Sequence, residues 1–105
     1  MAKKFETTVS FPQPLEKVYI AFFQAMQRMG LQITVDNQAS GLLTAHNSKS
    51  YSTDGEDLTV QVNAIPGGGT NVTVLSQCTS RMQIFDFGKN KKNVTKLIEA
   101  AGPYL

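Results

Sequence analysis

The stretch Leu58–Cys78, LTVQVNAIPGGGTNVTVLSQC, holds the most regular pattern in this chain of 105 residues. Up to Ala64, apolar residues alternate with polar ones, a period of two that is typical of a strand with one buried face. Pro66–Gly69 then predicts a tight turn, because proline and glycine supply the backbone angles that turns require. The alternation resumes at Val72, so the stretch predicts two antiparallel strands joined as a hairpin.

A second pair of strands is predicted before this hairpin. Leu31, Ile33 and Val35 alternate with polar residues and should share one face of a strand. Residues 41–48 carry another strand, which a short turn joins to the first. Two successive hairpins predict an antiparallel sheet, and residues 5–11, which also alternate, add a strand at the N-terminal end.

Two segments have the three- and four-residue spacing of amphipathic helices. The first begins at Pro14, since proline suits the first helical position, and it ends at Gly30. Ile20 and Phe23 lie beside its main apolar stripe and are hard to place inside a core. The second is a short helix marked by Val94, Leu97, Ile98 and Ala101, which Gly102 and Pro103 close.

The predicted fold is therefore α+β, an antiparallel sheet of about five strands with two helices on one face. The elements follow the order β-α-β-β-β-β-α, and residues 1–105 are expected to form a single domain. Helices on one face leave the other face of the sheet exposed to water, and its residues are accordingly polar. They are Thr8, Thr59, Gln61, Asn63 and Thr73.

The composition excludes several classes of function. A net charge of +2 and a pI of about 8.8 are too mild to indicate nucleic-acid binding. The single cysteine, Cys78, allows neither an internal disulfide nor a multi-cysteine zinc site. The sequence contains neither a hydrophobic signal core nor a segment of membrane-spanning length. The expected location is the cytoplasm, with no membrane partner, unless a leader has been removed.

The opening Phe5–Tyr19, FETTVSFPQPLEKVY, resembles the first strand and helix start of START-like, polyketide-cyclase-like proteins. The order of elements also resembles the TATA-box-binding-protein-like, or helix-grip, architecture. The START-like resemblance implies a space between helix and sheet for a hydrophobic ligand, although this chain is shorter than a full START-like domain. DNA-bending relatives of the second kind use aromatic wedges and basic residues on the outer sheet face. That face is polar here, so no nucleic-acid partner is expected.

No constellation of residues predicts catalysis or metal binding. His46 is the only histidine, and no spacing supplies it with a nucleophile or with further metal ligands. Cys78 is expected to be a small residue that faces the core. Residues 54–57, Asp-Gly-Glu-Asp, are expected to form a solvated hairpin turn, since the ligand spacing of a calcium loop is absent. The chain is therefore expected not to be an enzyme, with no catalytic residue, no metal and no cofactor.

The basic segment at the start of the last helix has two interpretations. In the first, Asp86 caps the helix, with Asn90 and Asn93 as an alternative cap, and the lysines are solvated. In the second, the helix N-terminus attracts an anion or an acidic partner, because its free N–H groups carry partial positive charge. The residues of this second, anion-binding site are Lys89, Asn90, Lys91 and Lys92.

The leading functional hypothesis is a small non-enzymatic module that binds an apolar ligand or partner between the first helix and the sheet. The residues expected to line that space are Leu15, Tyr19, Phe22, Phe23 and Met26. The alternative is an interaction module that self-associates through a sheet edge or the first helix, or that engages an acidic partner through the lysines. An enclosed cavity between helix and sheet would distinguish the first hypothesis from the second.

Overall fold

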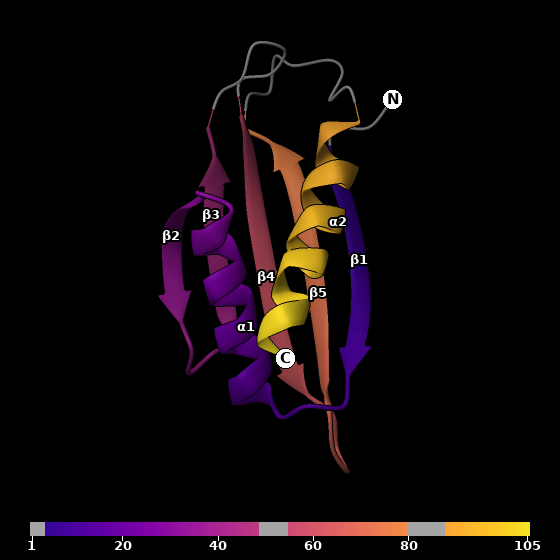
Figure 1. Ribbon diagram of the computed structural model, residues 1–105. Helices are drawn as coiled ribbons and strands as arrows, with labels where there is room; N and C mark the ends of the chain where they lie inside the picture. The colour runs from indigo at the N-terminus through magenta and orange to yellow at the C-terminus, as the bar shows by residue number, and fades with distance from the viewer. Residues whose placement is uncertain (1–3, 49–54, 80–87) are drawn as a thin grey trace.

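The computed structural model describes residues 4–48, 55–79 and 88–105. It contains one antiparallel sheet of five strands, in the spatial order β1-β5-β4-β3-β2, with two helices (Figure 1). The elements are β1 (Lys4–Phe11), α1 (Leu15–Arg28), β2 (Gln32–Asn37), β3 (Leu42–Asn47), β4 (Glu56–Ala64), β5 (Thr70–Cys78), α2 (Lys89–Ala101) and a 3-10 turn (Gly102–Tyr104). This order and this layering confirm the predicted α+β fold.

The two helices lie side by side on one face of the sheet and run in opposite directions (Figure 1). Helix α1 contacts β2 and β4, whereas α2 lies over β5 and β1. The chain leaves α1 through Gly30, which has a φ of 74°. The N–H of Leu31 donates to the carbonyl of Met26, and the N–H of Gly30 donates to that of Gln27, which satisfies carbonyls at the helix end. Neither helix has the length and apolar character needed to cross a membrane, within the residues described.

Strand β2 differs from its predicted pattern. Ile33 pairs with Ala45, but the next registered pair is Val35 with Thr44, so a bulge lies between Ile33 and Val35. Because a bulge inserts one extra residue, it reverses the face on which the following residues lie. The prediction that Val35 shares a buried face with Ile33 is therefore wrong, and the Val35 side chain is 40% exposed.

The space between the helices and the sheet is filled at its centre. The side chains that meet there from α1, α2 and the three central strands have no solvent-accessible surface. They include Val18, Phe22, Ala25, Met26, Leu43, Leu58, Val60, Val72, Val74 and Leu97. Phe11 and Phe22 add an edge-to-face ring contact with centroids 6.0 Å apart. No space large enough for a water molecule therefore touches these side chains.

Candidate functional site

The five residues predicted to line an apolar site all belong to α1, but they occupy two environments. Phe22 and Met26 have no exposed surface, and Tyr19 is 2% exposed. Leu15 and Phe23 are half-buried and pack against the margin of the core. A ligand between α1 and the sheet would have to displace the first three side chains. Leu15 and Phe23 keep exposed surface and can contact a ligand without that displacement.

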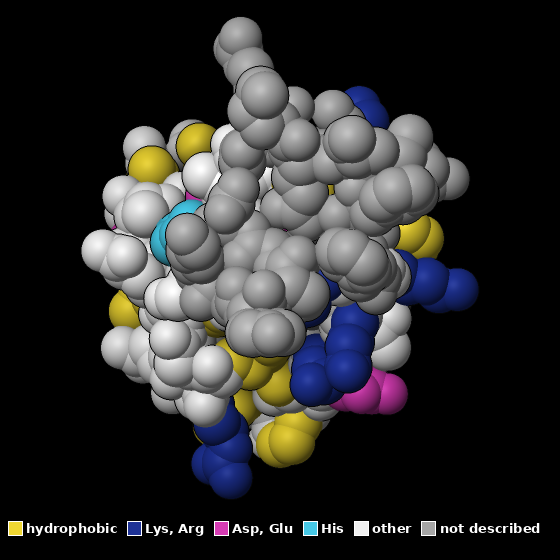
Figure 2. Space-filling view, turned by 90° about the horizontal axis from the view of Figure 1, so that it is seen from above, with side chains coloured by type: hydrophobic (Ala, Val, Ile, Leu, Met, Phe, Trp, Pro, Cys, Tyr) yellow, Lys and Arg dark blue, Asp and Glu magenta, His cyan; other side chains and the backbone are white. Residues whose placement is uncertain are grey.

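The predicted anion site is also divided. Lys91 and Lys92 are exposed, and Lys89 is half-buried. Asn90 points the other way: it is fully buried, and its Oδ1 accepts a hydrogen bond of 2.8 Å from the Ser76 hydroxyl. From the end of the molecule where α2 begins, the densest group of basic side chains lies on the side away from the single histidine (Figure 2). The lysines are thus the members of this set that an anion could reach.

The capping predictions for this helix are resolved in part. Gly88, with a φ of 73°, is the N-cap of α2. The alternative that Asn90 and Asn93 cap the helix is wrong, because both are buried and bonded to residues of the sheet. Asp86 lies outside the described residues.

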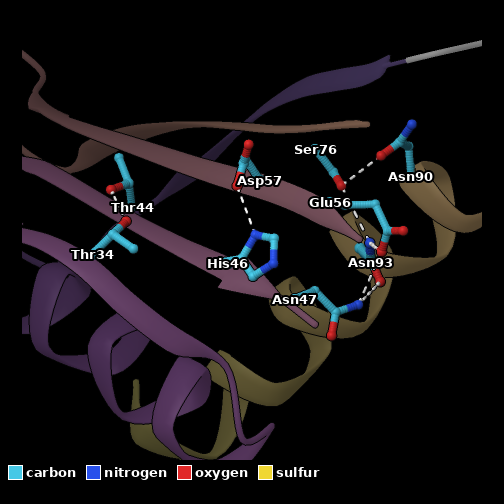
Figure 3. A network of polar contacts seen from close by, with 9 residues as sticks. All are labelled: Thr34, Thr44, His46, Asn47, Glu56, Asp57, Ser76, Asn90 and Asn93. Carbon is cyan, nitrogen blue, oxygen red and sulfur yellow. Dashed lines mark hydrogen bonds and ion pairs between the residues drawn. The ribbon is translucent and has the colours of Figure 1, made fainter. Parts of the chain in front are cut away.

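A buried polar cluster joins α2 to the sheet (Figure 3). The Asn93 amide donates to Glu56 Oε1 at 2.8 Å and to the Ser76 hydroxyl at 3.3 Å. The Asn47 amide donates to the same Glu56 oxygen at 3.0 Å. Glu56 has no exposed surface. A carboxyl group is rarely buried to this extent, and here the Asn47 and Asn93 amides donate hydrogen bonds in place of water.

Glu56 corrects the prediction of a solvated turn. Glu56 and Asp57 are the first two residues of β4 and not part of a turn. Glu56 lies on the same face of β4 as Leu58 and Val60, so its side chain points toward the helices, whereas the side chain of Asp57 points away from them. The alternation of β4 could have revealed this if it had been extended by two residues. Asp54 lies outside the described residues.

The histidine lies on the outer face of the sheet. His46 Nδ1 and Asp57 Oδ1 are 2.9 Å apart, on neighbouring strands that pair these two residues (Figure 3). Gly55 lies against this ring: a Cβ there would sit 3.1 Å from His46 Cε1 and 2.7 Å from the carbonyl oxygen of Asn47. His46 is therefore a hydrogen-bonded strand residue. Cys78 is half-buried, and its sulfur accepts a long contact of 3.5 Å from the Asn90 amide.

An open groove lies between α1 and the end of β2. It measures about 180 Å³ and is lined by Tyr19, Ile20, Phe23, Asp36 and Gln38. Ile20 is 47% exposed, so the groove has an apolar wall. The Tyr19 hydroxyl donates to Asp36 Oδ1 at 2.5 Å and to the carbonyl of Leu42 at 3.3 Å. This groove unites Tyr19 and Phe23, two predicted residues, with Asp36, which the sequence did not single out.

Burial raises the pKa of Tyr19 well above its usual range, and the Asp36 hydrogen bond and charge raise it further. The hydroxyl therefore stays neutral at any physiological pH. The Asp36 carboxylate is then the charged group among the described residues that line the groove.

The raised pKa of Tyr19 predicts an alkaline instability. Above about pH 10 the unfolded chain loses the tyrosine proton while the folded chain keeps it, so the stability present below that pH is lost as pH rises. The free energy of unfolding should fall by up to about 1.4 kcal/mol per pH unit there. Urea unfolding between neutral and alkaline pH will measure this slope. Tyr19→Phe should reduce it and Tyr104→Phe should not; equal slopes in wild type and Tyr19→Phe would contradict the assignment.

Comparisons by sequence give no matching family model and no matching curated protein. Comparison by structure finds likeness over most of the chain. The crystal structure of Ara h 8.0201 matches with a TM-score of 0.64 at 13% identity, covering 96% of this chain and 95% of that one. An Arabidopsis thaliana member of the major latex protein family matches at 0.61 and 16%, covering 96% and 92%. The adenylate sensor from AMP-activated protein kinase matches at 0.64 and 14%, covering 89% and 93%.

These likenesses concern the fold. They support the START-like fold that the resemblance of Phe5–Tyr19 implied and the helix-grip architecture that the order of elements implied. They do not support the TATA-box-binding-protein-like alternative. At such low identities they assign neither a ligand nor an activity to this chain.

Proposed function

We propose that the protein is a non-enzymatic binding module whose site is the groove between α1 and β2. The group bound there has an apolar stem and a positively charged head. The observation that carries this proposal is the juxtaposition of Ile20, a large and exposed apolar side chain, with the Asp36 carboxylate in one groove. The original hypothesis of an apolar partner at α1 is retained, but its site moves from the filled core to the outer flank of the helix.

The dimensions and chemistry of the groove define the group. Drug-sized ligands occupy sites of about 300–1,000 Å³. A groove of about 180 Å³ is smaller and open, so it suits a single elongated group. Ile20 and Phe23 would cover the stem, and the ring of Phe23 also favours a nearby cation. Asp36 would pair with the head, since Tyr19 occupies only one of its two oxygens.

The acid–base groups elsewhere support a binding role in preference to catalysis. His46 and Asp57 are bonded to each other on the opposite face of the sheet. Glu56 is buried and accepts hydrogen bonds from two amides. None of these groups belongs to the lining of the groove. A bound molecule would therefore meet the Asp36 carboxylate and apolar walls, without a histidine, a cysteine or a second carboxylate among the described lining residues.

Hexylammonium is the probe that tests this proposal, since it combines an apolar stem with a cationic head. In a two-dimensional NMR titration we expect saturable shifts at the amides of Ile20, Phe23 and Asp36. Ile20→Ser should weaken binding by about fivefold, because the stem loses its wall. Ile65→Ser, at a half-buried isoleucine outside the groove, is the matched control and should leave binding unchanged.

The charge is tested separately. Hexanol and hexanoate share the stem of the probe but lack its positive head, so both should bind more weakly than hexylammonium. Asp36→Asn should remove that preference while retaining the Tyr19 hydrogen bond. The proposal fails if hexylammonium produces no saturable shift around the groove, or if hexanoate binds equally well.

A further inference from the structure

We propose that the group bound in the groove is a lysine or arginine side chain, carried by an extended segment of another protein that pairs with the outer edge of β2. This inference rests on the proposed function and names its partner. The partner is recognised by two features: the unpaired backbone of an edge strand, and a carboxylate beside an apolar wall.

The first argument is the position of β2 in the sheet. The spatial order places β2 at one end of the sheet, where β3 is the one described strand that pairs with it (Figure 1). Among the described residues no strand pairs with its outer side, so an extended chain can bind the backbone N–H and C=O groups there by adding a strand. The groove lies beside this same edge, since Asp36 belongs to β2 and Gln38 follows it directly.

The second argument is the placement of the exposed apolar side chains. Among the described residues, Ile20 and Val35 are the large hydrophobic side chains exposed to solvent. Ile20 lies on the helix side of the edge, in the groove, whereas Val35 pairs with Thr44 on the opposite face of the sheet. Side chains of a strand point alternately to the two faces. One added strand would therefore cover both Ile20 and Val35, which a compact ligand in the groove would not do.

The third argument is charge and size. On the helix face of β2, the side chain of an added strand opposite Asp36 would enter the groove next to its carboxylate. The volume of about 180 Å³ suits one long side chain. A second copy of this chain paired through β2 would not supply the cation, because β2, QITVDN, contains no basic residue. A foreign segment with a lysine or arginine satisfies both the edge and the carboxylate.

The bulge limits the length of this pairing. The irregularity between Ile33 and Val35 divides the register between β2 and β3 into two short regular stretches, Gln32–Ile33 and Val35–Asn37. Bulges are one of the devices by which edge strands avoid indiscriminate pairing. The added strand should therefore be short, and the basic side chain should supply much of the affinity and the selectivity.

The probe for this inference is the acetylated and amidated peptide TVTKTVT, in which lysine and both valines share one face of a strand. We expect it to bind more tightly than hexylammonium and to slow hydrogen exchange at the amides of β2. Replacing its lysine by norleucine should weaken binding about tenfold. Two further peptides carry N-methyl groups on alternate amides, one on the odd-numbered and one on the even-numbered residues. The peptide whose methyl groups face β2 should also bind about tenfold more weakly than the parent peptide, because the methyl groups block strand pairing.

The charge can also be exchanged across the contact. Asp36→Lys should reject the lysine peptide and accept its glutamate counterpart, with thermal melting used to show that the variant is folded. Binding of the norleucine peptide to the wild-type protein also tests whether affinity depends on the peptide's positive charge, and it leaves the protein unchanged.

The outcomes separate the two proposals. If hexylammonium binds the groove but the peptide binds no more tightly, or both N-methylated peptides bind as well as the parent, the site exists and the strand-pairing inference is wrong. If hexylammonium itself does not bind, the proposed function and this inference both fail. Concentration-dependent self-association that protects the β2 amides without peptide would assign the edge to a second copy, and would overturn the inference.

Discussion

Replacing Glu56 with alanine should lower the free energy of unfolding by about 3 kcal/mol. The carboxylate is fully buried, and its Oε1 accepts hydrogen bonds from the amides of Asn47 and Asn93. Its removal leaves the buried Asn93 amide and the half-buried Asn47 amide without that acceptor and opens a void beneath the start of α2. Urea denaturation followed by circular dichroism will measure the change.

Two control variants isolate the cause. Asp57→Ala, one residue along β4 on the outer face, should cost less than about 1 kcal/mol, since exposed polar pairs contribute little. Asn93→Asp should destabilise strongly, because it puts a second carboxylate against Glu56 in a buried site. If Glu56→Ala is as stable as Asp57→Ala, the cluster does not anchor α2 to the sheet.

Replacing Phe22 with alanine should cost about 4 kcal/mol and create an apolar cavity between α1 and the sheet. Phe22 has no exposed surface and contacts the ring of Phe11. A dry cavity of this kind can bind a small apolar molecule, so benzene should raise the melting temperature of the variant and restore part of the lost stability. Thermal unfolding with and without benzene will measure both effects.

The adjacent Phe23→Ala is the matched control. Phe23 is half-buried at the groove, so its replacement should cost less and leave no enclosed cavity. Wild-type protein should not respond to benzene, because the centre of its core has no free space. Stabilisation of wild-type protein by benzene would show instead that an apolar site between α1 and the sheet already exists, and would restore the original form of the ligand hypothesis.

The sequence predicted the sheet well, because alternation with a period of two is a direct consequence of strand geometry. It failed at Val35, where the bulge between Ile33 and Val35 inserts one residue without a proline or glycine to mark it. The prediction for Glu56 was also wrong, because charged residues beside a glycine are normally assigned to a solvated turn and not to a buried strand position. In both cases hydrogen bonding between strands overrode the simplest interpretation of the residue types.

The candidate site could be predicted only in part. Ile20 and Phe23 stood out as apolar residues beside the main stripe of the first helix, and both line the groove. Asp36 could not be linked to Tyr19, because that contact depends on the bulge and on how β2 lies against α1. Periodicity describes each element separately, whereas a groove between two elements depends on their relative placement.

The pairing of β1 with β5 has a consequence for the order of folding during synthesis. Thr8 is bonded to Thr73 across a sequence separation of 65 residues, although both strands are neighbours in the sheet. The ribosome therefore releases β1 well before its partner β5, and contacts this distant along the chain form slowly. The hairpin of β4 and β5 can form as soon as both strands are synthesised. Until then β1, with its alternating polar and apolar residues, has no strand to pair with. A nascent chain that ends before β5 therefore exposes the apolar face of β1, and it is the form of this protein that we expect a chaperone to bind most strongly.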